Sequence, residues 1–294
     1  MVIFGGLFQD EAQNDLQLLS AADYSCVTVE TTGEAPSKRV GHASALFDST
    51  LIVWGGDTMA TAQDVLDSSL YLLDLDFREW IRVKIAGDVP PARYGHAAAM
   101  CGSKFYVYGG QEGDTFFDDM WSFDLDSCKS TWSPLWERVT IQPGAPSPSR
   151  RTGHAMITYE GKIYLFGGTD GKYHYNDTWC YDPMTDQWNN LTCIGFIPSP
   201  RESHAAAIVD DTMYIFGGRG VDGKDLGDLA AFKISNQRWY MFQNMGPAPS
   251  GRSGHAMATV GSKIFVIGGE GLTANEPDDP SLIHALETRK LKES

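Results

Sequence analysis

Short apolar runs recur along the chain, and six of them end in a pair of glycines. Three of these runs are Leu51–Trp54, Lys104–Tyr108 and Lys162–Phe166. β-Branched and aromatic residues dominate the runs, which is typical of buried strands rather than helices. The pairs lie 50 to 58 residues apart, at Gly5–Gly6, Gly55–Gly56, Gly109–Gly110, Gly167–Gly168, Gly217–Gly218 and Gly268–Gly269. The pattern predicts six similar β-rich units.

A second motif, R-x-G/S-H followed by alanine, precedes five of the six pairs. It starts at Arg39, Arg93, Arg151, Arg201 and Arg252, and it ends at His42, His96, His154, His204 and His255. The first glycine of the next pair follows the histidine by 13 residues in every case. A fixed offset within a variable period indicates one rigid element, so the variation in length lies in loops elsewhere.

Two further apolar stretches complete most units. A third strand is predicted at 70–75, 120–125, 178–183 and 229–234, and a fourth begins near Trp80, Trp136, Trp188 and Trp239. Proline-rich connectors follow and mark the ends of the units, because proline cannot donate a hydrogen bond to a strand ladder. Four short strands per repeat, with no helical period between them, predict radially repeated antiparallel sheets, which is a β-propeller.

These residues resemble the kelch repeat, whose hallmarks are the double glycine, an aromatic residue in the third strand and a Trp in the fourth. The resemblance covers essentially the whole chain. It implies an all-β, six-bladed kelch-type β-propeller that forms a single domain over residues 1–288, with the first and last blades incomplete. The predicted blades are 1–33, 36–86, 90–142, 147–195, 198–245 and 249–288, and residues 289–294 start a linker or tail.

The first and last units each lack one strand of the repeat. The first begins at Met1 inside the second strand, and the last has a third strand at 283–287 but no Trp strand. Propellers of the resembled family usually close by pairing strands from the two termini in one blade. We therefore expect residues upstream of Met1 to complete the fold.

The repeated residues are predicted to build the fold and not a metal site. Glycine tolerates positive φ and close backbone approach where the second strand ends, and each Trp is expected to pack between neighbouring blades. The repeated histidines belong to different blades, so they are expected to bond neighbouring groups instead of converging on one ion. Acidic residues before the third strand, among them Asp67, Asp119 and Asp177, are expected to cap the preceding turn. His174 and His284 lie outside the pattern and suggest no role.

The acidic composition of the chain argues against some classes of binding partner. Lys and Arg number 23 against 38 Asp and Glu, which gives a net charge of −15. With no basic stripe, the chain is not expected to bind nucleic acid, and its acidity is compatible with a basic partner. No apolar run approaches the ~20 residues needed to span a bilayer. The five scattered cysteines predict free thiols in the cytoplasm rather than disulfides or a zinc site.

The sequence predicts neither catalysis nor a cofactor. It has no nucleophile motif, phosphate-binding loop or cofactor fingerprint. A galactose-oxidase-like copper enzyme, which is also built on a kelch propeller, is the less favoured alternative because its Tyr and His ligands must converge. An iron-dependent specifier protein would need Asp and Glu four and eight residues before a His, and none of the seven histidines has them.

Several segments resemble the fungal cell-end polarity kelch proteins, the tip elongation aberrant family. They are Val40–Phe47, Leu51–Thr58, Arg93–His96, Tyr106–Gln111, Phe116–Asp119 and Gly251–His255. In that family the propeller precedes coiled coils, and the proteins travel on microtubules to growing cell ends, where they help to organise formin and actin. The resemblance implies a non-enzymatic protein-interaction scaffold in the cytoplasm, at the cortex or at cell ends, which oligomerises only through segments absent from this chain. Another kelch adaptor, such as a Rab-effector-like protein, is the alternative.

One rim of the propeller is the predicted partner site. The first strand starts and the second ends on the same face, so the residues before each Gly-His and after each double glycine meet there. Variable positions are favoured, because repeats differ where packing does not dictate the residue. The predicted rim comprises Tyr94, Gln111, Glu112, Thr152, Asp170, Tyr173, Glu202, Arg219 and Ser253, with Arg93, Arg151 and Arg252 beside it.

A peptide or a basic segment of a partner protein is expected to bind at this rim. Aromatic residues in the rim loops offer anchors, and Phe116 and Phe117 have the alternative of packing back on their own blade. Tyr173 and Tyr175 are the other two candidates. For the repeated arginines the alternative is a structural hydrogen bond from blade to blade.

Overall fold

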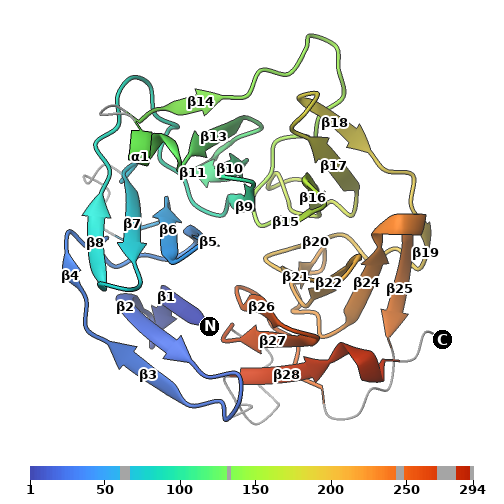
Figure 1. Ribbon diagram of the computed structural model, residues 1–294. Coiled ribbons are helices and arrows are strands. Elements are labelled where there is room, and N and C mark those ends of the chain that lie inside the picture. The colour runs from blue at the N-terminus through green and yellow to red at the C-terminus, as the bar shows by residue number, and fades with distance from the viewer. Residues whose placement is uncertain (60–66, 131–133, 243–247, 270–282, 292–294) are drawn as a thin grey trace. The chain divides into compact units, whose positions relative to one another are not determined.

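The computed structural model describes residues 1–59, 67–130, 134–242, 248–269 and 283–291. Strands and turns make up nearly all of this part of the chain, in which no helix is long and apolar enough to span a membrane. The chain divides into two compact units, Met1–Thr140 and Ile141–Ser294, whose elements are labelled in Figure 1. Each unit contains three main sheets, which confirms the predicted all-β, six-bladed propeller class.

The first unit contains the sheets that we call blades 1 to 3. Blade 1 has the order β1 (Val2–Phe8), β2 (Glu11–Leu19) and β3 (Cys26–Val29). Blade 2 has the order β5 (Ala43–Phe47), β6 (Thr50–Trp54), β7 (Leu70–Asp74), β8 (Glu79–Arg82) and β4 (Thr32–Gly33). Blade 3 has the order β9 (Ala97–Cys101), β10 (Lys104–Tyr108), β13 (Met120–Asp124) and β14 (Trp136–Arg138). A hairpin of β11 (Gln111–Glu112) and β12 (Thr115–Phe116) follows β10, and the short helix α1 (Ser127–Ser130) follows β13.

The second unit contains blades 4 to 6. Blade 4 has the order β15 (Ala155–Tyr159), β16 (Lys162–Phe166), β17 (Thr178–Asp182) and β18 (Gln187–Asn190). Blade 5 has the order β21 (Ala205–Val209), β22 (Thr212–Phe216), β24 (Leu229–Lys233), β25 (Arg238–Phe242) and β19 (Ile194–Gly195). Blade 6 has the order β26 (Ala256–Val260), β27 (Lys263–Ile267) and β28 (Ile283–Glu287). The remaining elements are the pair β20 (Arg201–Glu202) and β23 (Arg219–Gly220), and the 3₁₀ turns η1 (Ile234–Asn236) and η2 (Thr288–Lys290).

Blades 2 and 5 each carry a fifth strand that the repeat pattern did not predict. β4 runs parallel to β8, and β19 runs parallel to β25. Both short strands come from the connector that precedes an R-x-G/S-H motif. Residues 32–33 and 194–195, which the sequence placed at the ends of the preceding blades, therefore belong to the outer edge of the following blade.

The cores lie between consecutive blades of each unit, where the Trp residues of the fourth strands pack. The Trp80 ring of blade 2 lies 5.0 Å from the Phe4 ring of blade 1, between centroids. In the second unit the Trp239 ring of blade 5 lies 4.8 Å from the Phe166 ring of blade 4. Trp188 of blade 4 is also buried, at 1% exposure. Large flat rings contribute much of the apolar area buried in a core, so these contacts hold neighbouring blades together.

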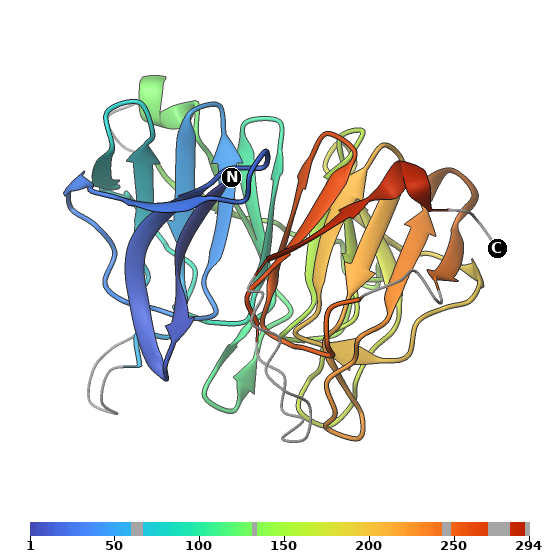
Figure 2. The ribbon, with the colours of Figure 1, turned by 90° about the horizontal axis from the view of Figure 1, so that it is seen from below.

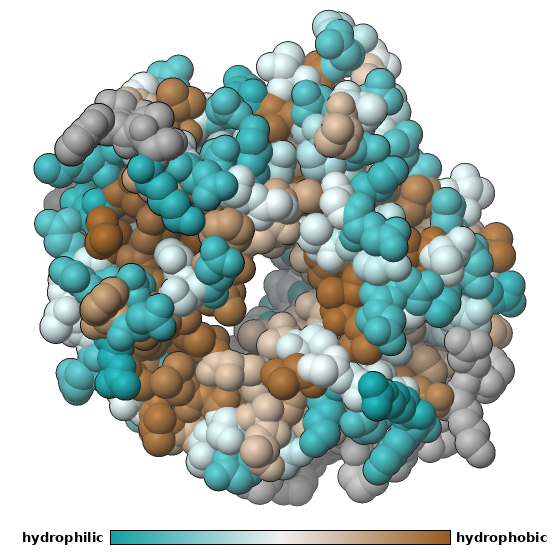
Figure 3. Space-filling view, in the orientation of Figure 1, coloured by the Kyte–Doolittle hydropathy of each residue, from teal (hydrophilic) through white to brown (hydrophobic). Residues whose placement is uncertain are grey.

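Apolar side chains also reach the surface of blade 1. Leu18 and Val27 lie opposite each other on β2 and β3 and are 36% and 56% exposed. Figure 3 shows apolar residues over β2 and β3 at the lower left of the view. A few exposed apolar residues are normal on a protein surface, so this area by itself indicates no site.

Candidate protein-interaction rim

In blades 2 to 5 the residue that follows the double glycine pairs with the residue that precedes the Gly-His or Ser-His step. Val40 bridges Asp57 in blade 2, and Tyr94 bridges Gln111 in blade 3. Backbone hydrogen bonds of 2.9 and 3.0 Å join Tyr94 and Gln111 in both directions. We call the end of each blade at which these pairs lie the rim. In the first unit the β11–β12 hairpin extends from the rim toward the bottom of Figure 2, whereas α1 lies at the top.

The rim of the second unit is tied together by side chains. The backbones of Glu202 and Arg219 pair as neighbouring strands in blade 5. His174 Nε2 lies 3.3 Å from Glu202 Oε1, which joins blade 4 to blade 5. Arg219 Nη2 lies 3.3 Å from Ser253 Oγ of blade 6. His174, to which the sequence analysis gave no role, therefore belongs to a line of polar contacts along three blades.

The side chains of the arginines beside the rim lie inside their own blades, which corrects their prediction as binding residues. The blade-to-blade hydrogen bond is instead made by their backbone carbonyl oxygens, as when Arg93 accepts from the Gly56 N–H. Arg93 and Arg151 are fully buried, and Arg252 is 5% exposed. Arg93 Nη1 donates to the Gly109 carbonyl oxygen of its own blade at 2.9 Å, and its Nη2 lies 3.0 Å from Asp119 Oδ2. The guanidinium thus fixes the double-glycine turn of its own blade and presents no surface to a partner.

The aspartates before the third strands receive these guanidinium groups. The pairs are Arg39–Asp67, Arg93–Asp119, Arg151–Asp177 and Arg201–Asp228. Asp67 caps its turn as predicted, since the Ser69 N–H donates to it at 2.9 Å, but the ion pair was missed. In all four blades the aspartate follows the arginine by 26 to 28 residues, and this spacing is a signal from which the pair could have been predicted.

Two of these carboxylates have lowered pKa values. Burial alone would raise the pKa of Asp119, but hydrogen bonds from Arg93 and its positive charge outweigh burial and lower it. Burial likewise opposes the ionised form of Asp67, yet hydrogen bonds from Tyr71 and Arg39 lower its pKa to about 2. Both aspartates are therefore ionised at neutral pH, as an ion pair with arginine requires.

Three of the repeated histidines connect their blade to the preceding blade of the same unit. His96 Nε2 lies 3.2 Å from the Trp54 carbonyl oxygen, and His204 and His255 make the same contact with carbonyl oxygens of blades 4 and 5. Desolvation by burial lowers the pKa of His96 and His204 to about 3 and that of His42 and His255 to about 4. These four rings are neutral at pH 7, and Nε2–H is the donor to the carbonyl oxygen.

The described residues contain no group of three or more His, Cys, Asp or Glu side chains placed to hold a metal ion. The contacts of His96, His204 and His255 with backbone carbonyl oxygens account for their position in the fold.

The double glycine lies where the end of the second strand approaches the histidine of the same blade. Gly110 has a φ of +93°, and a Cβ there would lie 2.8 Å from His96 Cβ and 3.0 Å from the Tyr94 carbonyl oxygen. Only glycine fits such a position without strain. The glycine pair also reaches the next blade, since the Gly56 N–H of blade 2 donates to the Arg93 carbonyl oxygen of blade 3 at 2.8 Å.

Two predicted rim residues are buried, which corrects their prediction as exposed binding residues. Thr152 is 6% exposed and Ser253 is 7% exposed. Thr152 bridges Thr169, which is itself 4% exposed, so this part of the rim presents mainly backbone. The other predicted rim residues are at least partly exposed: Tyr94, Gln111, Glu112, Asp170, Tyr173, Glu202 and Arg219.

Three of the predicted aromatic anchors differ sharply in exposure and contacts. Tyr173 projects from its loop and is 56% exposed. Tyr175 instead donates its hydroxyl to Asp170 at 2.9 Å, and its ring lies 4.2 Å from the Arg151 guanidinium carbon. The Phe117 ring lies 4.0 Å from the guanidinium carbon of the buried arginine of blade 3. Tyr175 and Phe117 therefore pack on their own blades, whereas the Tyr173 side chain is more than half exposed.

Asp170 shapes the loop that carries Tyr173. The backbone N–H groups of Lys172 and Tyr173 donate to Asp170 Oδ1 at 2.9 and 2.7 Å. Burial alone would raise the pKa of Asp170, but these bonds and that from the Tyr175 hydroxyl lower it. Since three donors converge on this carboxylate, its first role is to hold the loop.

Val221, which is not among the predicted rim residues, lies in the loop between β23 and β24 and is 71% exposed. A single valine between Gly220 and Asp222 belongs to no repeat and no apolar run, so the sequence carries no signal for it. Together with Tyr173 it gives the rim of the second unit exposed apolar surface.

Sheets joined through repeated Trp, His and Gly contacts, with rims that differ from blade to blade, define a kelch-type propeller. The family model described as KLHDC2/KLHL20/DRC7 Kelch-repeats domain matches residues 1–138 and 61–269. The chain belongs to the kelch-repeat family, whose propellers are protein-interaction domains.

The chain is similar to fungal and animal kelch proteins. It is 38% identical over 292 residues to Tip elongation aberrant protein 1 of Schizosaccharomyces pombe, an alignment covering 99% of this chain and 25% of that protein. It is 30% identical to Kelch repeat-containing protein 2 of Saccharomyces cerevisiae, over 97% of this chain and 33% of that protein. Kelch domain-containing protein 3 of Homo sapiens is 28% identical, with coverage of 94% and 75%. The predicted resemblance to the tip elongation aberrant family is thus confirmed, and the chain spans a quarter to a third of the length of the two fungal relatives.

Proposed function

We propose that this chain is the propeller of a non-enzymatic scaffold of cell polarity, which acts at growing cell ends and binds a protein partner at its rim. The observation that carries the proposal is that a buried, repeated arginine is followed directly by a partly exposed residue that varies between blades. Arg93 and Arg201 are fully buried, whereas the next residues, Tyr94 and Glu202, are partly exposed and differ from each other. A constant frame with a variable surface is suited to the recognition of one partner among many.

The cell-end part of the proposal draws its support from similarity. The match to Tip elongation aberrant protein 1 extends over 99% of this chain, and none of the three relatives described above bears the name of an enzyme. A place in the cytoplasm, at the cortex or the cell ends, follows from the same relationship and is part of the proposal.

The chemistry of the rim favours a peptide that carries an apolar side chain beside basic residues. Tyr173 and Val221 are 56% and 71% exposed in loops of the second unit. The same rim carries the carboxylates of Glu202 and Asp222, and the whole chain has a net charge of −15. An apolar side chain would supply anchoring area and the charge would steer a basic segment toward the rim.

A chimera tests this function. The aligned region of Tip elongation aberrant protein 1 would be replaced by this chain in Schizosaccharomyces pombe, with a fluorescent tag, and compared with a protein from which the region is deleted. We expect the chimera to gather at the cell ends and the deletion protein to gather there less. A chimera that distributes like the deletion protein would contradict the cell-end role.

A general kelch adaptor is the second candidate function. It is favoured by Kelch domain-containing protein 3, because the alignment covers 75% of that protein and leaves little room for cell-end segments. The two functions differ in the chimera, since an adaptor binds its partner through the rim without taking the protein to cell ends.

A further inference from the structure

The outer edges of blades 2 and 5 are closed by the chain itself. The Glu34 N–H of the connector donates to the Trp80 carbonyl oxygen at 3.1 Å. In blade 5 the Phe196 N–H donates to the Trp239 carbonyl oxygen at 3.0 Å. In both blades the residue before the donor is a glycine, and the connector runs parallel to the fourth strand. These are two independent examples of the same closure.

Blade 3 begins this closure and does not complete it. The Ala86 N–H donates to the Pro134 carbonyl oxygen at 2.9 Å. This bond is equivalent to the one in blade 2 that the Thr32 N–H donates to the Arg78 carbonyl oxygen. Among the backbone hydrogen bonds of the described residues, none joins the connector of blade 3 to the Trp136 carbonyl oxygen. The connector therefore leaves β14 after Ala86.

The glycines of the two connectors show the same difference. A Cβ at Gly33 would lie 2.1 Å from the Trp80 carbonyl oxygen, because the two backbones are in contact. A Cβ at Gly87, the equivalent residue in blade 3, would have no heavy atom within 4 Å. The space that the connector fills in blade 2 is open in blade 3.

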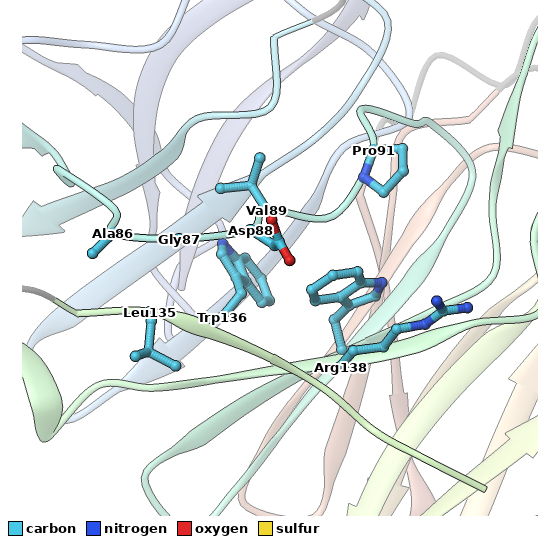
Figure 4. Close-up of a pocket in the computed structure, with 9 residues that line it drawn as sticks. Ala86, Gly87, Asp88, Val89, Pro91, Leu135, Trp136 and Arg138 are labelled. Carbon is cyan, nitrogen blue, oxygen red and sulfur yellow. The ribbon is translucent and has the colours of Figure 1, made fainter.

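A groove of about 730 Å³ lies between this connector and β14, as Figure 4 shows. Val89 and Leu135 line it and are 37% and 50% exposed, so its walls are partly apolar. The Trp136 side chain is 4% exposed, and its Nε1 has no hydrogen-bond partner in the described part of the chain. In Figure 4 the nitrogen edge of this indole faces the segment of Gly87 and Asp88.

The backbone of β14 is oriented to receive a strand. The Val139 N–H donates to the Met120 carbonyl oxygen of β13 at 2.9 Å. Because the backbone groups of successive strand residues point to opposite sides, those of Trp136 and Arg138 point away from β13 and toward the groove. An edge with unpaired N–H and C=O groups is a template for a further strand.

We propose that this groove binds an extended peptide segment of a partner protein as a fifth strand of blade 3, parallel to β14, with a glycine opposite Trp136. The two closed blades specify the occupant. A Cβ at Gly33 or Gly195 would lie 2.1 or 2.2 Å from the carbonyl oxygen of the facing Trp, so the residue at that place must be glycine. The next residue of the peptide donates its N–H to the Trp136 carbonyl oxygen.

The charge at the end of β14 adds a further requirement. A parallel peptide has its carboxyl end toward Arg138, an exposed residue that lines the groove. An acidic side chain after the glycine would pair with it. This site lies on the outer edge of a blade rather than on the rim, so it goes beyond the function proposed above and does not depend on it.

The test uses a labelled synthetic peptide, Gly-Glu-Ala-Pro-Ser-Lys, which has the sequence of residues 33–38. It begins at the equivalent of Gly87, because Ala86 already occupies the place of Thr32 on blade 3. Its binding to the full chain is measured by fluorescence anisotropy. Two matched peptides replace the glycine by alanine or methylate the nitrogen of the residue that follows it. We expect each change to weaken binding about tenfold or more, since the first introduces a clash and the second removes a hydrogen bond.

Two protein variants locate the binding. Leu135→Glu changes the wall of the groove and is expected to weaken binding of the unmodified peptide about fivefold or more. Phe77→Glu is the matched control, because Phe77 is 79% exposed in a turn of blade 2 and does not line the groove. Melting temperatures of both variants would show that they are folded.

Three results would overturn the proposal. One is equal binding of the three peptides, and another is binding that Leu135→Glu and Phe77→Glu affect equally. The third is the absence of saturable binding up to about 5 mM peptide, a limit that corresponds to a very weak site. If no saturable binding is found and the Arg138 amide is protected from hydrogen exchange, the chain's own connector closes the β14 edge of blade 3.

Discussion

In blades 2 to 5 the rim lies next to a buried layer, which consists of the arginine and histidine of the R-x-G/S-H motif, the aspartate paired with that arginine, and the double glycine. This layer keeps the same residues from blade to blade, whereas the rim does not. Arg93 and Arg201 are fully buried and make the same contacts in blades 3 and 5. Their neighbours Tyr94 and Glu202 differ in chemistry and in the contacts of their side chains. In this fold the recurrence of a residue indicates a structural role, and we propose that binding specificity lies at the next position.

The difference has an energetic basis. A buried guanidinium that lost its aspartate would be a buried charge without compensation. Replacing either member of the pair is therefore expected to lower the free energy of unfolding by several kcal/mol. A partly exposed rim side chain can change with little effect on stability. Substitutions in the buried layer should therefore cost more stability than substitutions of exposed residues.

Acid is expected to act most strongly on the buried layer. The folded pKa of His96 and His204 is about 3 and that of His42 and His255 about 4, against an ordinary value of 6.5. Between pH 6.5 and about 4 the unfolded chain binds protons that the folded chain does not, so the free energy of unfolding falls as pH falls. Each histidine adds up to about 1.4 kcal/mol per pH unit. Urea unfolding at several pH values measures the slope.

A single substitution assigns that slope to the histidines. His96→Gln should reduce the slope between pH 6.5 and 4 by about one proton. The contribution of Asp67 does not interfere, because its pKa is lowered from 3.8 to about 2 and its stabilisation is lost only below that window. A slope that stays the same in His96→Gln would show that this histidine titrates normally in the folded protein.

Arg93→Ala is expected to remove about 3–5 kcal/mol from the free energy of unfolding, because it leaves Asp119 partly buried and without its partner. The matched control is Lys104→Ala. Lys104 pairs with Glu137 at 3.1 Å in the same blade, but the two side chains are 38% and 60% exposed. The control should cost less than about 1 kcal/mol. Equal losses in urea unfolding would mean that burial does not distinguish the two ion pairs.

Gly110→Ala is expected to cost more than about 2 kcal/mol, since it combines a positive φ with a clash in the buried layer. Gly102→Ala is the control, because Gly102 has a φ of +60° but a Cβ there would meet no heavy atom within 4 Å. The control should cost about 1 kcal/mol, from the left-handed conformation alone. Thermal unfolding of the two variants separates the cost of the clash from the cost of the left-handed conformation. A loss of stability in Gly110→Ala that is no larger than the loss in Gly102→Ala would exclude the clash.

Ser203→Gly should have the smallest effect. Ser203 has a φ of +55° where the four other R-x-G/S-H motifs have glycine, and its N–H donates to the Gly153 carbonyl oxygen at 2.7 Å. Glycine relieves the left-handed strain but adds freedom to the unfolded chain, so stability should change by less than about 1 kcal/mol. A loss larger than this in thermal unfolding would show that the serine side chain itself stabilises the turn.

The fold could be predicted from sequence because its signals are local. The glycine pair at Gly109–Gly110 and the apolar run before it lie within one strand and its end, and the fixed offset to His96 stays inside one hairpin. These positions identified β10 and its equivalents, and the period identified the blades.

The site was predicted less completely because it depends on contacts between distant residues. Asp119 was read as a turn cap because its partner Arg93 lies 26 residues away, across a loop of variable length. Thr152 has the position of Tyr94 in the repeat but faces Thr169, so its burial depends on a neighbour that the repeat does not specify. The parallel strands β4 and β19 are two residues long, which is too short for a periodic signal.

Affinity purification with quantitative mass spectrometry, from cells that express the intact protein, measures whether partners bind at the rim. The rim variant carries Tyr94→Ala, Glu112→Ala, Tyr173→Ala and Val221→Ala together. Its control carries Phe77→Ala and Met184→Ala, which are 79% and 90% exposed in turns between third and fourth strands. The account predicts that the rim variant loses partners that the control keeps, at melting temperatures within about 4 °C of the unchanged protein. Recovery of the same partners by both variants would contradict it.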